Sequence, residues 1–240
     1  MKKIRLLLLL IAPLSTYAQE GAYQLTITGT KLIPPAKVWL MLSKSKADTA
    51  KFNKGAYAIS GKDSLNKVVS LKIDRDGSGK QVNTFPIFLA GGAIVIKLDT
   101  GELTITGNTL SRQFQEELVT PMSLEAKNRN WLAFEYDAAI DHNSPDLANF
   151  KKRYDQETAV YYAIPENFIK HAPGSPLAIP ALTIMGNALT GMQGKDNPGF
   201  ATMVDDLNKL FHSLSPAIQN SPEGLKYAQR LAKLKAAESN

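Results

Sequence analysis

The sequence predicts an α+β protein with an amino-terminal antiparallel β-sandwich or partly open barrel of roughly seven or eight strands, followed by an α-helical region. Two observations support this fold class. Across residues 23–107, apolar and polar side chains alternate and turn-forming residues recur at short intervals, as in consecutive antiparallel strands. After Gly107, apolar residues recur every three or four positions, which is the period of a helix face.

The strands are expected in chain order. In the first, Tyr23, Leu25 and Ile27 alternate with polar neighbours until Gly29. Further strand-length segments lie at residues 38–42, 56–60 and 68–73. Residues 85–90, 93–98 and 102–106 are separated by turn signals at residues 91–92 and 99–101, so they predict a closing three-stranded meander.

The helices are expected after this meander. Leu110, Phe114 and Leu118 recur every four residues, and a second face carries Leu147, Phe150, Tyr154 and Tyr161. Four Ser-Pro pairs resemble helix starts, because serine caps free amides and proline suits the first helical position: Ser144-Pro145, Ser175-Pro176, Ser215-Pro216 and Ser221-Pro222. The last helix, at residues 223–237, is expected to carry Leu225, Ala228, Leu231 and Leu234 along one side. The change of period predicts a β-sandwich domain at 19–108 and a helical region at 109–240.

The first eighteen residues have the pattern of a cleavable signal peptide. Lys2, Lys3 and Arg5 precede an apolar run at residues 6–11, and a small-x-small site ends at Ala18. The run is shorter than the about 20 residues that a membrane span needs. We therefore predict an exported, periplasmic protein cleaved after Ala18, with no membrane span.

Cysteine content and charge exclude several classes of protein. The chain has 0 cysteines, so lipoprotein anchoring, disulfides and thiol chemistry are excluded. Removing the three basic residues of the signal from the formal charge of +6 leaves +3, without a dense basic run. Nucleic acid is therefore not expected as a partner. An envelope protein or a second copy of the chain is the expected kind of partner.

Three sets of residues are candidates for binding a metal ion or sharing a proton. The loop at residues 74–80 resembles the first half of a calcium loop, but Phe85 stands where a closing carboxylate belongs, which favours a plain hairpin loop. Asp137 and Asp141, beside His142, could share a metal or a proton, although such spacing is common on solvated helix faces. His171 and His212 are too distant in sequence to complete a local ligand pattern. We predict no catalytic, cofactor-binding or metal-binding residues and no cofactor.

Six aromatic residues could line a groove for a sugar or a peptide, or could belong to the core. They are Trp39, Trp131, Phe134, Tyr136, Tyr161 and Tyr162.

The segment "FPIFLAGGAIVIKLDTGELTITGNTLSRQFQEEL", the later "FIKHAPGSPLA" and the near-terminal "LNKLFHSLSPAIQNSPEGLKYAQRL" resemble one family. It is the uncharacterised amino-terminal region that precedes the thioredoxin-like domain in exported thiol:disulfide interchange proteins. The matching positions are Phe88, Leu89, Gly92, Ile94, Ile96, Gly107, Asn108, Phe168, Ile169, Pro173, Ser175, Leu210, Ser221, Gly224 and Tyr227. Ala90 departs from the family's acidic residue. The chain ends at Asn240, where the family's thioredoxin-like domain is expected to begin, and whether this end is natural stays open.

The resemblance implies a non-enzymatic, exported binding or docking module without redox activity of its own. Thiol exchange needs a thiolate, which this chain does not contain. The alternatives are an envelope protein that binds a small ligand, a glycan or a peptide, and a carboxylate-based enzyme that uses Asp137 and Asp141.

Overall fold

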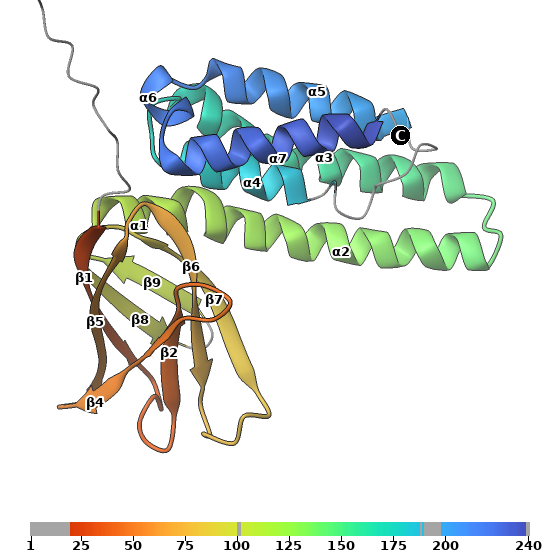
Figure 1. The fold of residues 1–240 in the computed structure, drawn as a ribbon. Helices are drawn as coiled ribbons and strands as arrows, with labels where there is room; N and C mark the ends of the chain where they lie inside the picture. Colours follow the sequence, from red (N-terminus) through yellow and green to blue (C-terminus); the bar gives the residue numbers. More distant parts are fainter. Residues whose placement is uncertain (1–19, 100–101, 188, 190–197, 239–240) are drawn as a thin grey trace, which may run out of the picture.

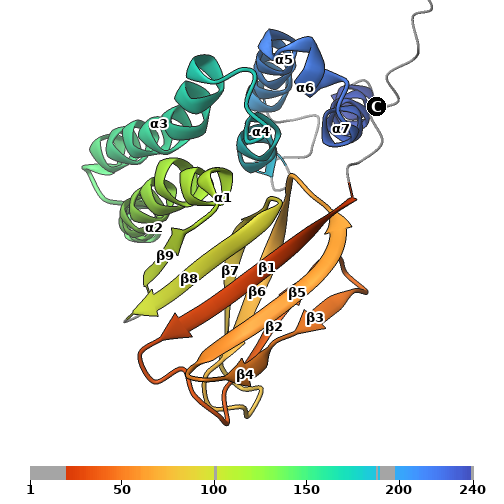
Figure 2. The ribbon, with the colours of Figure 1, turned by 90° about the vertical axis from the view of Figure 1, so that its left-hand side faces the viewer.

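The computed structural model describes residues 20–99, 102–187, 189 and 198–238, and it has an α+β fold (Figure 1). Two β-sheets form one end of the molecule, and the helices stack on the other end (Figure 2). The predicted signal peptide and its cleavage site lie outside the described residues. So does the second half of the turn expected at residues 99–101.

Nine strands in the described residues are divided between the two sheets. The first sheet has the order β4-β5-β1-β8-β9. Its strands are β1 (Glu20–Gly29), β4 (Lys51–Asn53), β5 (Ala56–Ser64), β8 (Gly92–Asp99) and β9 (Glu102–Thr106). The second sheet has the order β3-β2-β6-β7, with β2 (Lys37–Met41), β3 (Ala47–Thr49), β6 (Lys67–Asp74) and β7 (Val82–Leu89). The two sheets do not close into a barrel.

The topology corrects two predictions. β1 and β8 pair in parallel, with Leu25 opposite Ile94, so the first sheet is mixed and not wholly antiparallel. The predicted three-stranded meander does not form, because β7 and β8 belong to different sheets; its last two strands do pair, as β8 and β9. Three consecutive buried residues, Ile87, Phe88 and Leu89, mark the place where the chain leaves the second sheet for the first.

The alternation read from the sequence places one set of side chains between the sheets. Tyr23, Leu25 and Ile27 from the first sheet and Leu40 and Leu71 from the second are at most 2% exposed and belong to one apolar cluster. Burial of these apolar side chains stabilises the β half.

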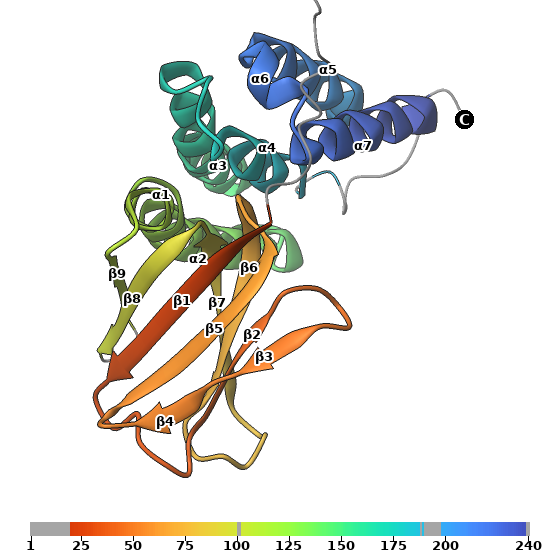
Figure 3. The ribbon, with the colours of Figure 1, turned by 60° about the vertical axis from the view of Figure 1, so that its left-hand side comes forward.

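The helical half begins with one long run of helix. α1 (Thr109–Gln113) continues through a π-helical segment, η1 (Phe114–Val119), into α2 (Thr120–Asp141), and α3 (Leu147–His171) returns antiparallel to α2 (Figure 1). Next come α4 (Ala178–Asn187), α5 (Pro198–Ser213), α6 (Pro216–Gln219) and α7 (Pro222–Glu238). Figure 3 shows α1 directly above the end of β8, with α4 and α7 above the other strands of the sheets.

Two of the four Ser-Pro pairs start helices as predicted. α6 begins at Pro216 and α7 at Pro222, and the Ser221 hydroxyl accepts the Gly224 amide at 3.0 Å. After Ser144 and Ser175 the helices begin a few residues later, because these hydroxyls accept amides in the preceding turns. In the last helix Leu231 and Leu234 are buried, whereas Leu225 is 53% exposed and was wrongly placed on the buried side.

Residues at and just after the end of β7 join the two halves. Phe88 and Ala90 belong to the apolar cluster of the helices, although their neighbours Ile87 and Leu89 belong to the cluster between the sheets. The ring of Phe88 lies 5.9 Å from that of Phe114, centroid to centroid. One residue of β7 therefore packs the helices onto the outer face of the second sheet.

Candidate functional site

A cleft of about 850 Å³ lies between the second sheet and the helices. We call it the junction cleft. Its floor contains Val68 of β6 and Pro86 of β7, which point away from the core between the sheets. Its walls contain Met122 and Ala126 of α2 and Thr183 of α4. Leu42, Ser43, Ser64, Asn66, Lys67, Phe114, Val119, Ser123, Tyr161, Ile179, Pro180, Ile184, Asn187, Glu223 and Lys226 complete the lining.

The π-helical turn shapes one wall of this cleft. Pro121 has no backbone N–H, so the regular helical hydrogen bond of that turn cannot form. In the residue before it, the amide of Thr120 donates to the carbonyl of Gln115, five residues back. The Gln115 side chain also donates to the Thr120 hydroxyl at 3.1 Å. Such widened turns are frequent at functional sites. Here η1 contributes Phe114 and Val119 to the lining.

Each charged side chain that lines the junction cleft has an ion-pair partner within the chain. Lys67 pairs with Asp63 at 2.7 Å, and their side chains are only 18% and 12% exposed. Lys226 pairs with Glu223 at 2.6 Å at the start of α7. The cleft therefore combines an apolar interior with neutral polar groups and paired charges at its rim.

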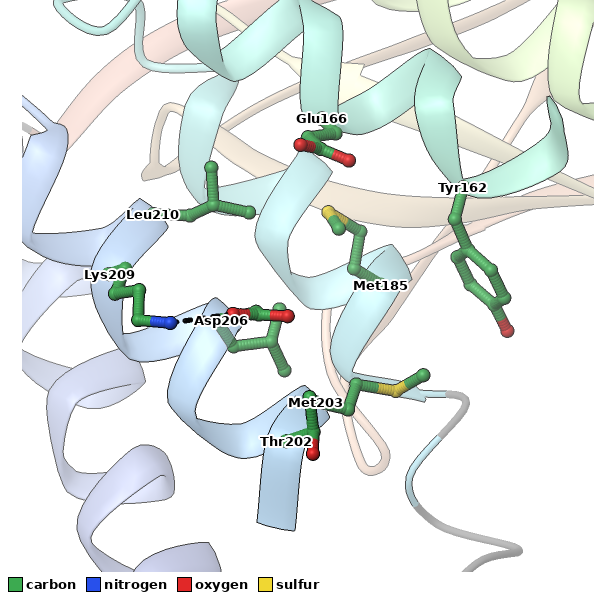
Figure 4. A pocket seen from close by; sticks show the side chains of 9 residues that line it. Tyr162, Glu166, Met185, Thr202, Met203, Asp206, Lys209 and Leu210 are labelled. Atoms are coloured by element: carbon green, nitrogen blue, oxygen red, sulfur yellow. Dashed lines mark hydrogen bonds and ion pairs between the residues drawn. The ribbon is translucent and has the colours of Figure 1, made fainter. Parts of the chain in front are cut away.

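A second pocket, of about 570 Å³, lies among α3, α4 and α5 (Figure 4). Met185, Met203 and Leu210 supply apolar surface, and Tyr162 stands at the edge. Its lining carboxylates are both paired, Asp206 with Lys209 at 3.0 Å and Glu166 with Lys170 at 2.5 Å. α4 lies between this pocket and the junction cleft, because its residues line both.

The calcium-like loop uses its oxygens internally. Asp74 is 1% exposed, and its two carboxylate oxygens accept the amides of Gly77 and Gly79 at 3.0 and 2.8 Å. The Lys37 ammonium donates to the Gly77 carbonyl at 2.9 Å, where a cation would need oxygen ligands. These bonds favour the plain hairpin loop over the calcium site.

The structure does not join the carboxylates singled out from the sequence. Asp137, Asp141 and His142 are exposed, and neither carboxylate has a hydrogen bond or ion pair among the described residues. His171 and His212 lie on other helices. No group of three potential metal ligands occurs in the part of the chain that the structure describes.

The helix pair instead brings together Glu125 of α2 and Glu157 of α3. A hydrogen bond with Glu125 raises the pKa of the Glu157 carboxyl above its usual value, and burial raises it further. The Oε1 atom of Glu157 is buried and has no hydrogen-bond partner among the described residues. The sequence carries no local signal for this pair, since the residues lie on separate helices.

The six aromatic residues do not share one groove. Tyr161 lines the junction cleft and Tyr162 the second pocket. Tyr136 stacks on Tyr154, with ring centroids 6.1 Å apart. Trp131 and Phe134 are 63% and 66% exposed on α2, and Trp39 lies half-buried on β2.

Several residues of the family-like pattern have structural roles. Gly92 and Gly107 have positive φ angles of 91° and 90°, which favour glycine. Asn108 caps α1 by accepting the Ser111 amide at 3.0 Å. A side chain at Gly224 would collide with the Ile218 carbonyl, and the Tyr227 hydroxyl donates to the Leu182 carbonyl at 3.1 Å. These residues of the pattern therefore have roles in the fold, and none of them forms a binding site.

No protein-family model matches the chain, and no curated protein is significantly similar to it. Among the described helices, none is both long and apolar enough to cross a membrane.

Proposed function

We propose that this chain is a non-enzymatic, exported binding module that holds its ligand in the junction cleft. The cleft is the observation that supports this function. Its volume of about 850 Å³ falls within the roughly 300–1,000 Å³ typical of ligand sites, and its mostly apolar lining with a few polar groups is also typical. The β half would then be a sandwich that presents the outer face of its second sheet to the ligand.

Two sequence arguments accompany the proposal. The predicted signal peptide supports export to the cell envelope. The resemblance to the region that precedes the thioredoxin-like domain of thiol:disulfide interchange proteins supports an accessory role without redox chemistry. The rival, carboxylate-based enzyme has less support, because Asp137 and Asp141 do not line the junction cleft.

Binding of the neutral, apolar dye Nile red tests the proposal. We expect its fluorescence to rise with the native protein and the rise to be lost in Ala126→Trp, whose indole would fill the cleft. Ala159→Trp is the matched control, because Ala159 lies exposed on α3 and does not line the cleft. Equal dye binding by all three proteins, each folded by circular dichroism, would reject the cleft as the site.

A further inference from the structure

We infer that the junction cleft receives an extended, uncharged polypeptide segment with apolar side chains. The inference rests on the proposed function, since it names the ligand class of the same cleft. It follows from three properties of the lining: its paired charges, its unused hydrogen-bonding side chains and its lack of an open aromatic platform.

The paired charges argue against a charged ligand. Lys67 is held by Asp63, which also binds Lys46 at 2.6 Å, so its ammonium has a fixed partner in a shielded position. Lys226 has its own partner in Glu223. A phosphate or carboxylate ligand would have to displace a carboxylate that is already hydrogen-bonded, which costs free energy. Because the charged groups of the lining already have partners, the cleft favours an uncharged ligand.

Two side chains at the rim offer hydrogen bonds that the chain does not use. Asn66 lies in the turn between β5 and β6, and Ser123 lies on α2. Neither side chain has a hydrogen-bond partner among the described residues, and each provides both a donor and an acceptor. The φ angle of 60° at Asn66 explains the preference for asparagine in this turn but leaves its amide free.

A polypeptide fits these groups better than a lipid chain or a sugar does. Each of its residues presents an N–H and a C=O, whereas a hydrocarbon chain presents neither. A sugar would need an aromatic face, but Phe114 is 1% exposed and the guanidinium of Arg129 covers one face of Tyr161 at 4.5 Å. Apolar side chains on the floor and backbone groups at the rim are the arrangement expected for an extended peptide.

Competition against Nile red tests the ligand class. The probe is an acetylated and amidated hexapeptide of leucine, valine and serine, and dodecanol serves as the hydrocarbon comparison. We expect the peptide to displace the dye. Asn66→Gly keeps the turn and Ser123→Ala keeps the helix, and each should weaken displacement by the peptide about fivefold, as the loss of one hydrogen bond predicts. The affinity for Nile red is measured for each variant, and displacement by the peptide is compared relative to it, with the displacement by dodecanol expected to stay the same.

The remaining outcomes separate the two proposals. Displacement by dodecanol but not by the peptide, or equal displacement by the peptide in the native protein and both variants, would overturn the polypeptide class while the cleft remains a binding site. Stronger displacement by a peptide with a central lysine or glutamate would also overturn it. If Nile red does not bind the native protein at all, the proposed function itself fails.

Discussion

At the residue scale, Asp63 is the most strongly held carboxylate of the β half. Its side chain is 12% exposed and accepts from Lys46 and Lys67 and from the amide of Ser64. These donors hold the pKa of Asp63 well below its usual range. Lys67 also lines the junction cleft. The same ion pair therefore stabilises the β half and gives the ammonium in the cleft a partner.

Asp63→Asn is therefore expected to lower the free energy of unfolding by about 2 kcal/mol at neutral pH, since it leaves the shielded Lys67 without its carboxylate. A depressed pKa gives stability that is present above the unfolded value of about 3.9 and lost as pH falls through the folded value. The native protein should lose stability below about pH 4, and the variant should lose less.

Urea unfolding across pH measures both effects. The exposed Asp99, paired with Lys97, supplies a control in Asp99→Asn, and an equal loss there would contradict the prediction.

Glu157 is expected to give the opposite pH dependence of stability from Asp63. Its pKa is raised, so the folded state holds a proton that the unfolded state releases, and stability falls as pH rises from about 4.3 through the folded value. Glu157→Gln should unfold at a higher temperature than the native protein at pH 8 and show a smaller difference at pH 4. Glu117→Gln, on an exposed position of η1, should show no such dependence. Identical pH profiles for the native protein and Glu157→Gln would refute the raised pKa of Glu157.

At the element scale, the side chain of Asn108 ties the start of α1 to the turn between β7 and β8. Asn108 accepts the Ser111 amide and donates to the Gly91 carbonyl at 2.7 Å. The Ser111 hydroxyl in turn donates to the Phe88 carbonyl at 2.7 Å. These bonds set the direction in which the long helix leaves the sheets, and thus the position of the cleft wall.

Asn108→Ala should therefore cost about 1–2 kcal/mol of stability, as the loss of a helix cap does. Asn108→Asp keeps the capping oxygen but loses the donor to Gly91, so its melting temperature should fall between those of the native protein and the alanine variant. Thermal unfolding followed by circular dichroism measures the order. If aspartate were as damaging as alanine, the bond to Gly91 would be the dominant contribution and the cap a minor one.

The free edge of β7 is protected against pairing with another strand. The carbonyl of Leu89 faces β6 and accepts a hydrogen bond from the Asn66 amide at 2.8 Å. The carbonyl of the preceding residue, Phe88, therefore faces the free edge, where it accepts a hydrogen bond from the Ser111 hydroxyl. Pro86, two residues earlier, has no N–H to donate. Both features limit strand addition at this edge, so an added peptide strand is not expected along β7.

At the scale of the whole molecule, the contact between Phe88 and Phe114 decides whether the two halves act as one unit. Phe114→Ala removes a side chain that is 1% exposed and should cost about 3–5 kcal/mol. Because both halves use this contact, we expect them to unfold together. In Trp131→Phe, Trp39 becomes the single tryptophan and reports on β2, while circular dichroism reports mainly on the helices. Non-coincident transitions in that protein would show two independent domains.

The sequence predicted best what depends on neighbouring residues. The alternation at Tyr23, Leu25 and Ile27 identified the buried face of β1, and the β8–β9 pair followed from its turn residues. The helical repeat of Phe114 and Leu118 identified a buried face in the same way. In each instance the period of side chains along one element is set by backbone geometry alone.

Features that join distant segments were missed or misassigned. The parallel pairing of β1 with β8 connects residues far apart in sequence, and the alternation of either strand is the same for parallel and antiparallel partners. Glu125 and Glu157 meet only because α3 folds back along α2. Asp137 and Asp141, which are close in sequence, are exposed on α2, where no site was predicted.

The α+β class, the change from strands to helices after Gly107 and the exclusion of thiol chemistry follow from the sequence, because composition and side-chain period are local properties. Only the tertiary structure decided the sheet order and the junction cleft. The lining of that cleft extends from Leu42 to Lys226 and comes from strands, helices and turns. Its shape depends on how one residue, Phe88, packs the helices onto the second sheet. Such packing is set by contacts between elements, which no pattern along the chain records.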